Sequence, residues 1–428
     1  MSRFQRLLRP RNALAFSAAA ATATGTYAYT KSLTPKTPAL PIPELARDDS
    51  NRIIPPTFPP VRSRADQLAD LRSSGATAQS PEEYDLLIIG GGATGTGIAL
   101  DAITRGLKVA LVERDDFSAG TSSKSTKLVH GGVRYLEKAV WNLDYSQLEL
   151  VMEALRERKS FLTIAPHLSV SLPIMIPLAQ WWQVPYMWMG TKMYDLLAGS
   201  QRLEGSYYMG KQASMETCPR LNGDRLVGSL VYYDGQHNDS RMNVGLAMTA
   251  SLYGATVLNH VEVTSLDKGP DGKIRGAQLR DTLSGSDAFP VRAKGVINAT
   301  GPFADAIERM DDPSRKPIVA PASGVHIILP QNVCPNGMGV LDAATSDGRV
   351  IFILPWQGYT LAGTTDTACE VEADPIPSQT DVDFILKETN KLLRPDSVLT
   401  RDDVLASWSG TFYPHPTYCF VNPATNTI

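Results

Sequence analysis

The stretch Leu87–Ala99, LIIGGGATGTGIA, decides how the fold is interpreted. An apolar run over residues 84–90 predicts a strand, and residues 94–106 carry the apolar spacing of a helix. A second apolar run, residues 107–113, follows and ends in an acidic residue. This order of strand, loop, helix and strand predicts a βαβ unit that binds a dinucleotide.

The three glycines of this loop have different expected roles. Gly90 allows the tight turn, Gly92 lets the backbone approach a pyrophosphate, and Gly95 lets the helix pack against the strand. The helix N-terminus offers unpaired N–H groups to phosphate oxygens. Glu113 stands where an acid is expected to bond ribose hydroxyls. A glycine-rich turn without a ligand is the alternative, and the loop alone does not separate NAD from FAD.

The composition is that of a soluble enzyme with two or three domains. The 428 residues are enough to bury a large core, and the net charge of −3, without a basic stripe beyond the N-terminus, argues against a nucleic-acid partner. The four cysteines are scattered, without a CxxC pair. We therefore expect free thiols, no disulfide scaffold and no metal site.

The chain begins with an arginine-rich segment in which no acidic residue precedes Glu44. This pattern predicts a mitochondrial presequence over residues 1–30. Its Ala/Thr-rich part, residues 13–30, has only marginal transfer energy for a membrane span, so a bipartite signal, a weak anchor and a disordered basic tail stay open. The proline-rich residues 31–83 predict an extended, unpacked linker, with the folded domain beginning near Glu83.

The rest of the chain alternates between α/β and β-rich segments. A helix is predicted over residues 145–165, and the aromatic and methionine cluster at 181–199 is expected in the core or a domain interface, with a membrane-facing patch as the alternative. The other predicted elements are a strand at 167–178, a helix and strand over 241–268, a hairpin around 273–285, a strand, turn and helix over 291–310, strands over 314–365 and a helix over 379–392.

A second turn favours FAD over NAD. Val296–Gly301, VINATG, is an apolar strand that runs into a turn of small residues before a helix. In two-domain flavoproteins such a turn brings the backbone close to the nucleotide a second time, which an NAD dehydrogenase does not need.

Several motifs, in this order, resemble the FAD-dependent glycerol-3-phosphate dehydrogenases of the mitochondrial, quinone-linked type. The longest covers residues 85–139, and the shorter ones are NATGPFAD, GVHIILP, VIFILPWQG, LAGTTDT and RDDVLASWSG. The resemblance spans roughly residues 84–410. It implies oxidation of sn-glycerol 3-phosphate to dihydroxyacetone phosphate, with electrons passing through FAD to ubiquinone at the inner mitochondrial membrane. It leaves a homodimer open.

The implied fold is α/β: a Rossmann-like FAD-binding domain of the glycine-oxidase and glutathione-reductase kind, with an inserted antiparallel-sheet substrate domain. We assign residues 84–165 and 241–312 to the FAD-binding domain and residues 166–240 and 313–410 to the substrate domain. Residues 411–428 form an atypical tail.

The resemblance also implies site residues. Beside the glycine loop and Glu113, the expected FAD contacts are Thr121, Ser122, Ser123, Lys127, Val263, Ala299, Thr300 and Gly301. Arg134 is the first choice for the substrate phosphate, because a guanidinium grips two oxygens at once. His326 is the first candidate for the base that takes the hydroxyl proton, His130 the second. Arg349 and Thr365 are further candidates for the substrate pocket.

The chain departs from the family pattern after Gly410. The family continues with an apolar residue, an arginine and a proline, whereas Phe412 stands where the arginine is expected. The glycine-rich segment that completes the flavin domain is also missing, so we expect a C-terminally truncated form with uncertain activity. Two other interpretations stay open: a different flavin oxidase of this fold acting on an amine or hydroxy acid, and a non-catalytic FAD-binding fragment.

Overall fold

The computed structural model describes residues 47–52, 54, 60–75, 82–132, 136, 139, 144–334, 337–343 and 345–412. The chain packs as two compact units, a smaller one of residues 1–58 and 131–156 and a larger one of residues 59–130 and 157–428. In the smaller unit, Asn51 N donates to Asp48 O at 2.9 Å and closes a turn. Helix α5 (Tyr145–Ile164) confirms the helix predicted over residues 145–165. The predicted presequence and the tail beyond residue 412 lie outside the described residues.

A six-stranded sheet in the larger unit contains the predicted βαβ unit. Strands β1, β2, β7 and β10 run parallel, and β8 and β9 extend the sheet with antiparallel pairs. In spatial order the strands are β7 (Thr256–Leu258), β2 (Val109–Val112), β1 (Tyr84–Ile89), β10 (Phe289–Asn298), β9 (Ile274–Asp281) and β8 (Val261–Lys268). The predicted hairpin is the β9–β10 pair.

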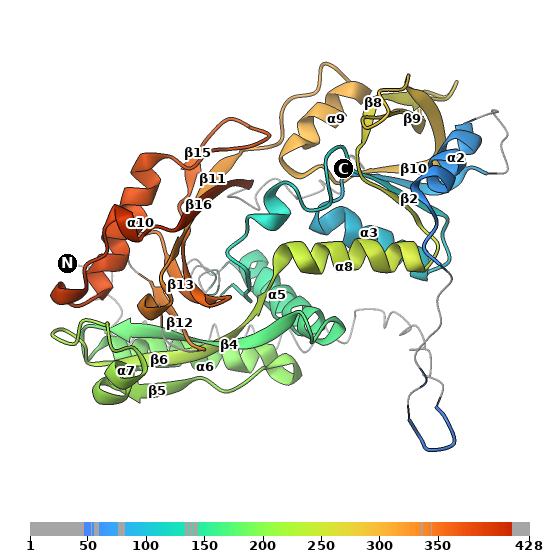
Figure 1. Cartoon of the computed structure of the whole chain (residues 1–428). Coiled ribbons are helices and arrows are strands. Elements are labelled where there is room, and N and C mark those ends of the chain that lie inside the picture. The colour runs from blue at the N-terminus through green and yellow to red at the C-terminus, as the bar shows by residue number, and fades with distance from the viewer. Residues whose placement is uncertain are drawn as a thin grey trace. The chain divides into compact units, whose positions relative to one another are not determined.

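Alternating residues of β1 serve two different cores. Ile88 packs with helices α3 (Ala93–Thr104) and α8 (Asp239–Leu252), which lie side by side in Figure 1. Leu87 and Ile89 point to the other face, where α2 (Arg64–Gly75) and α9 (Ala304–Asp311) pack. Burial on both faces explains why residues 86–89 of the strand are all apolar.

Helix α2 corrects the predicted linker. Residues 64–75 are helical rather than extended, and Leu71 is fully buried in the core of the six-stranded sheet. The side chain of Gln67 accepts a hydrogen bond from Val257 N at 2.8 Å, which covers the edge strand β7. The pattern Ser63-x-x-Asp66 is a helix-start signal: Asp66 N donates to Ser63 Oγ at 3.1 Å. The folded part therefore begins before Glu83.

The second sheet of the larger unit has ten strands and is antiparallel except where β12 pairs with β4. This sheet confirms the antiparallel sheet that was predicted as part of the α/β fold. Its main path is β15 (Thr367–Ala368), β11 (Ala322–Leu329), β14 (Tyr359–Gly363), β13 (Ile351–Trp356), β12 (Gly339–Asp342), β4 (Ser169–Leu178), β6 (Gly228–His237) and β3 (Leu128–Val129), with β16 (Ala406–Phe412) paired to β11 and β5 (Tyr207–Gly210) to β6.

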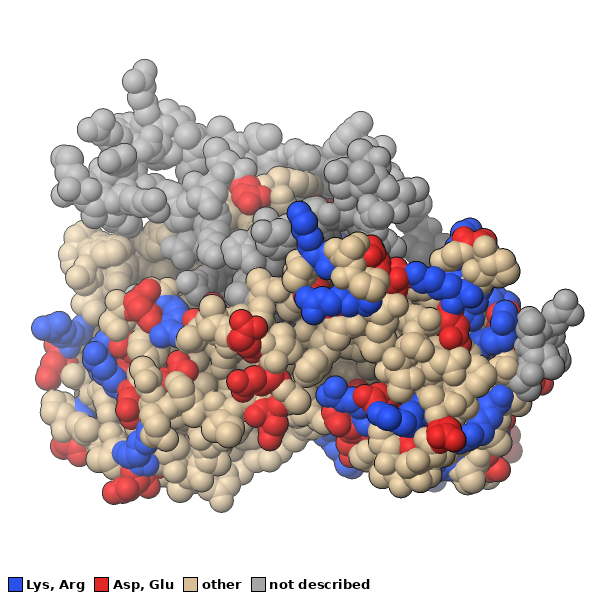
Figure 2. Space-filling view, turned by 90° about the horizontal axis from the view of Figure 1, so that it is seen from above, with Lys and Arg blue, Asp and Glu red and all other residues tan. Residues whose placement is uncertain are grey.

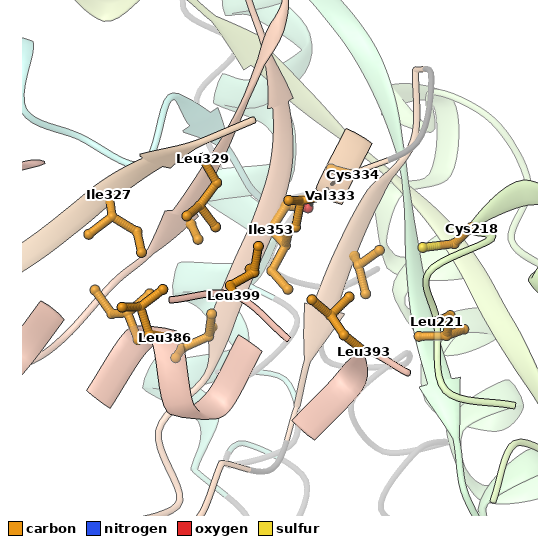
Figure 3. Close-up of a cluster of buried hydrophobic side chains, with 14 of the residues drawn as sticks. Cys218, Leu221, Ile327, Leu329, Val333, Cys334, Ile353, Leu386, Leu393 and Leu399 are labelled. Carbon is orange, nitrogen blue, oxygen red and sulfur yellow. Dashed lines mark hydrogen bonds between the residues drawn. The ribbon is translucent and has the colours of Figure 1, made fainter. Parts of the chain in front are cut away.

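One face of this sheet is closed by helix α10 (Gln379–Leu392), at the predicted position. Ser378 caps the helix by accepting from Asp381 N at 3.0 Å. Figure 3 shows the core between them, with Ile327 and Leu329 of β11 and Leu386 of α10 among its side chains. Because neighbouring residues of a strand point to opposite faces, His326 lies on the face away from α10.

Helix α6 (Gln183–Ala198) contains most of the aromatic and methionine cluster, and short α7 (Lys211–Thr217) follows β5. The prediction that this cluster is core holds only in part: Tyr194 is buried at 2%, but Trp181 is 76% and Leu196 75% exposed. No helix among the described residues is long and apolar enough to cross a membrane. On the face shown in Figure 2, acidic and basic side chains are interspersed.

Candidate active site

The glycine loop joins β1 to α3 with almost no space between backbones. Gly90 has φ +110°, and a Cβ on it would lie 2.5 Å from the Ala299 carbonyl oxygen. A Cβ on Gly95 would lie 1.9 Å from the Gly90 carbonyl oxygen. Gly92, the N-cap of α3, has no side chain; Ala93 N donates to Ser122 Oγ, and the helix dipole still makes this N-terminus electropositive, as a pyrophosphate site requires. The loop therefore fits a dinucleotide.

Neighbouring polar side chains hold this loop from two sides. Glu113 accepts from Gly91 N at 2.6 Å and from Asp115 N at 2.8 Å, so its carboxylate supports the loop, and its ribose contact stays a prediction. Asn243 of α8 donates to the Gly91 carbonyl oxygen at 2.8 Å and accepts from Thr96 at 2.6 Å. The sequence analysis missed Asn243, whose only signal is a polar residue among small ones.

The second predicted turn meets the first. Ala299 N donates to the Ile89 carbonyl oxygen at 2.8 Å, directly beside the glycine loop, and Thr300 Oγ1 donates to Asn298 Oδ1 at 2.7 Å. Gly301 follows with φ +58°. Val263 lies on the edge strand β8, whose first residue donates from Val261 N to the Glu113 carbonyl oxygen at 2.7 Å, and its contact with the adenine stays a prediction.

The segment from Thr121 to Lys127 links the loop to the ten-stranded sheet. At its start, Ser122 Oγ accepts from Ala93 N at 2.9 Å, at the first residue of α3. Thr121 Oγ1 donates to the Thr411 carbonyl oxygen of β16, and Ser123 Oγ to that of Gly120. At its end, Thr126 Oγ1 lies 3.0 Å from His326 Nε2. The residue that contacts α3 and the residue that contacts the predicted base are thus only four peptide bonds apart.

His326 stands in a row of residues that face each other across four strands. Gly363 of β14 pairs with both Phe352 of β13 and His326 of β11, and His326 pairs with Trp408 of β16. The imidazole stacks on Trp408 with ring centroids 5.7 Å apart, and a Cβ on Gly363 would lie 2.5 Å from His326 Cδ2. His130 is exposed and stacks on Phe352 at 6.4 Å. The structure therefore brings both histidines to one face.

Burial controls the charge of this site. Burial, supported by the Lys127 cation and opposed by Asp239, lowers the pKa of His326 to about 3. Burial also lowers the pKa of Lys127, while its ion pair with Asp239 raises it. The imidazole is neutral at pH 7, as a proton acceptor must be.

Two predicted substrate residues do not face this site. Arg349 donates to Asp347 at 2.7 Å and stacks on Phe384 of α10, which places it on the opposite face from His326. Thr365 is fully buried, and its hydroxyl accepts from Val325 N at 3.0 Å, so it supports β11. A substrate contact of either residue stays a prediction. Arg134 lies outside the described residues. Within the described ranges, no cluster of three or more His, Cys, Asp or Glu side chains forms a metal site.

Comparisons with known proteins agree with this geometry. The chain is 58% identical over 339 residues to the mouse protein "Glycerol-3-phosphate dehydrogenase, mitochondrial", covering 78% of this chain and 46% of the relative. It is 48% identical over 427 residues to the protein of that name from Saccharomyces cerevisiae, covering 94% and 63%. The chain thus spans about half the length of its mammalian relatives.

Solved structures show the same fold. A glycerol-3-phosphate dehydrogenase from Bacillus halodurans complexed with FAD matches with a TM-score of 0.64 and 31% identity, over 81% of this chain and 59% of that one. Glycine oxidase from Geobacillus kaustophilus, 21% identical, matches with a TM-score of 0.55 over 79% and 87%, which supports the fold alone. The family model described as FAD dependent oxidoreductase matches residues 85–424. With its two glycine-bearing turns packed as a dinucleotide site requires, the chain belongs to this family of FAD-dependent oxidoreductases.

Proposed function

We propose that this chain oxidises sn-glycerol 3-phosphate to dihydroxyacetone phosphate. The observation that carries the proposal is the Thr121–Lys127 segment, which connects the N-terminus of α3 to the buried imidazole of His326. The likeness to glycerol-3-phosphate dehydrogenases supports the choice of substrate. Because the chain covers less than half of the mammalian relatives, the activity is a proposal for the chain as it stands.

The residues divide into two tasks. The loop of Gly90, Gly92 and Gly95, with the turn at Ala299, would hold FAD, which when bound supplies a hydride acceptor. His326 would accept the proton of the C2 hydroxyl while the hydrogen on C2 leaves as hydride, which turns the alcohol into a ketone.

The charge of the substrate favours this proton transfer. An imidazole with a pKa of about 3 is neutral but weakly basic. The arrival of a phosphate dianion beside it raises its proton affinity, because an opposite charge stabilises the imidazolium ion. The base therefore strengthens when the substrate is present. The guanidinium of Arg134, the first choice for the phosphate from the sequence, would hold that dianion.

The test is a visible spectrum of the full chain loaded with FAD, followed by glycerol 3-phosphate without oxygen. We expect the flavin band to bleach, and to bleach roughly 10²–10⁴ times more slowly in His326→Gln. His167→Gln is the matched control, since His167 is exposed and far along the chain from the site. Bleaching by sarcosine or glycine but not by glycerol 3-phosphate would favour an amine oxidase. A flavin band that no substrate bleaches would indicate an FAD-binding fragment without catalysis.

We further propose that the electrons pass to ubiquinone and that the protein lies on the inner mitochondrial membrane. The exposed apolar surface at α6 supports this, because Trp188, Met189 and Leu196 of the helix and Trp181 just before it are all exposed. Large apolar side chains exposed together on one helix mark interaction surfaces, and aromatic rings favour the interface between lipid and water.

Liposome flotation tests the membrane contact. We expect the full chain to float with vesicles that contain cardiolipin and ubiquinone, and Trp181→Ser with Trp188→Ser to remain in the soluble fraction. Tyr253→Ser is the control, because Tyr253 is equally exposed but follows α8. Unchanged flotation of the tryptophan double variant would exclude α6 as the contact.

A further inference from the structure

A lysine of the Thr121–Lys127 segment lies on the same face of the ten-stranded sheet as the imidazole of His326. Gly410 stands two residues after Trp408 in β16, and Trp408 pairs with His326 of β11. Residues two apart in a strand point to the same face, so a Cβ on Gly410 would point to the face of the imidazole. Such a Cβ would lie 3.0 Å from Lys124 Cβ and 3.9 Å from Lys124 Cδ. The stem of Lys124 therefore crosses this face of the sheet over Gly410.

Lys124 is also fixed close to the proposed base. Its carbonyl oxygen accepts from Trp408 Nε1 at 3.4 Å, and Trp408 stacks on the imidazole. Thr126 contacts His326 Nε2 and is two residues from Lys124, so the Cα atoms of the two residues are about 7 Å apart at most. In glycerol 3-phosphate the phosphorus is three bonds from C2. A cation that serves the phosphate of a substrate held by His326 must therefore lie in this neighbourhood.

The two lysines at the end of this segment differ in what their ammonium groups can still bind. Lys127 Nζ donates to both carboxylate oxygens of Asp239 at 2.7 Å and to the Ser123 carbonyl oxygen at 2.5 Å, which occupies its three N–H donors. Among the described residues, Lys124 Nζ has one partner, Asp374, at 3.2 Å. Lys124 therefore has donors left for a ligand, whereas Lys127 has none.

The ion pair of Lys124 is easily exchanged for another. The side chain of Lys124 is only 16% exposed, but that of Asp374 is 94% exposed, in the loop between β15 and α10. An ammonium that has lost most of its water gains little from a carboxylate that stays hydrated, because pairs of this kind contribute little. A phosphate dianion brings more charge and three oxygens to the same donors, so it is the better partner for Lys124.

We propose that Lys124 binds the phosphate of the substrate and that Asp374 is its counterion in the free chain, which the phosphate displaces. The inference rests on the proposed function, because the substrate named there carries this phosphate. It adds a second cation to Arg134, the first choice for the phosphate from the sequence. Substrate binding then breaks only one exposed ion pair.

Isothermal calorimetry with the full chain loaded with FAD tests the role of Lys124. The probes are dihydroxyacetone phosphate and inorganic phosphate, neither of which can reduce the oxidised flavin. Lys124→Met keeps an unbranched stem over Gly410 but removes the charge, and it should bind both probes roughly 10- to 100-fold more weakly, the range of one charged hydrogen bond. Lys124→Arg should recover most of this loss, because a guanidinium also donates to phosphate oxygens.

A second variant, Asp374→Asn, covers the case in which Lys124→Met does not fold, since Asp374 is exposed. Removing the competing carboxylate should tighten binding of both probes roughly two- to fivefold. The gain should vanish when Lys124→Met is combined with Asp374→Asn, because Asp374 acts through Lys124. Lys268 and Asp311, a pair at 2.9 Å on β8 and α9, are the matched controls: Lys268→Met and Asp311→Asn should change neither affinity more than about twofold.

Three results would overturn the proposal: equal affinities of Lys124→Met and the unchanged chain, a gain from Asp374→Asn that persists in the double variant, and an unchanged chain that binds neither probe. Flavin bleaching by glycerol 3-phosphate judges the proposed function separately. A chain that binds the probes through Lys124 but is not bleached keeps the phosphate site and loses the activity. A chain that is bleached but binds equally well without Lys124 keeps the activity and loses the site.

Discussion

Replacing Gly95 with alanine tests the packing on which the dinucleotide site depends. The new Cβ would lie 1.9 Å from the Gly90 carbonyl oxygen and 3.1 Å from its carbon, both backbone atoms. To reach even 3.0 Å, helix α3 or the loop must move by about 1.1 Å. Overpacking of this kind typically costs about 1–3 kcal/mol, and we expect the upper end because no flexible side chain can yield.

The same helix offers a matched control. Gly97 lies two residues farther along α3, and a Cβ there meets nothing within 4 Å. Gly97→Ala should therefore stabilise the chain by about 0.8–1 kcal/mol, the usual advantage of alanine over glycine inside a helix. Urea unfolding followed by circular dichroism gives both free energies of unfolding, and flavin absorbance after gel filtration gives the FAD content. We expect Gly95→Ala to lose both stability and bound FAD.

Equal free energies of unfolding in Gly95→Ala and Gly97→Ala would be the contradicting result. If Gly95→Ala and Gly97→Ala unfold within about 0.5 kcal/mol of each other, the usual spread for harmless surface changes, the close approach of α3 to Gly90 does not exist. A Gly95→Ala variant that is less stable but keeps its full FAD content would separate the two roles: the packing would stand, and the loop would not be the nucleotide site.

Three further predictions concern the fold and the charge of the site. Leu71→Ala should destabilise the chain by about 2–5 kcal/mol in urea unfolding, because Leu71 is fully buried, whereas Leu283→Ala, 63% exposed, should change little. Asn243→Ala removes one of two donors to the Gly91 carbonyl oxygen, which keeps Ser118 N at 3.2 Å, and should cost about 0.5–1.5 kcal/mol and lower FAD content; full retention of FAD would show that the loop does not need Asn243. The unfolded chain protonates His326 below pH 6.5, whereas the folded chain does so only near pH 3, so the free energy of unfolding falls as pH falls between these values. From pH 6.5 to 5 this loss should be about 2 kcal/mol larger in the unchanged chain than in His326→Gln. Equal losses in the two chains, measured by urea unfolding at each pH, would contradict this.

The dinucleotide half of the fold could be predicted because its signals are local. The strand, glycine loop, helix and second strand occupy consecutive residues 84–112, and each shows its own periodicity. Helix α10 was predictable for the same reason, since its apolar residues recur at helical spacing and Ser378 caps its start.

Helices α2 and α6 could not be predicted from their own residues. α2 has only two leucines in a polar, proline-flanked stretch, and its helix is stabilised by burying Leu71 against a sheet whose strands follow later in the chain. In α6 the apolar residues suggested a core, but burial depends on what covers a helix rather than on its composition. Tertiary packing decided both cases.

The same distinction between local sequence signals and tertiary packing applies to the candidate site. His326 was identified by resemblance, but its surroundings come from a strand order, β13–β14–β11–β16, that does not follow the chain. Phe352 and Trp408 flank the same row although 56 residues separate them in sequence, and no local pattern shows that they share a face. Arg349 was proposed for the pocket as a phosphate ligand, and from just before β13 its guanidinium stacks on Phe384 of α10.

Alternation along β11 explains why this site needs both the core and the turn. Val325 and Ile327 point into the α10 core and fix the strand, so His326 between them must point to the other face. A strand fixes where a side chain begins but not how its ring is oriented, because the imidazole still rotates about its own bonds. Trp408 restrains the ring plane by stacking, and Thr126 marks one nitrogen. The core thus sets the position of the imidazole, and the contacts with Trp408 and Thr126 restrain its orientation.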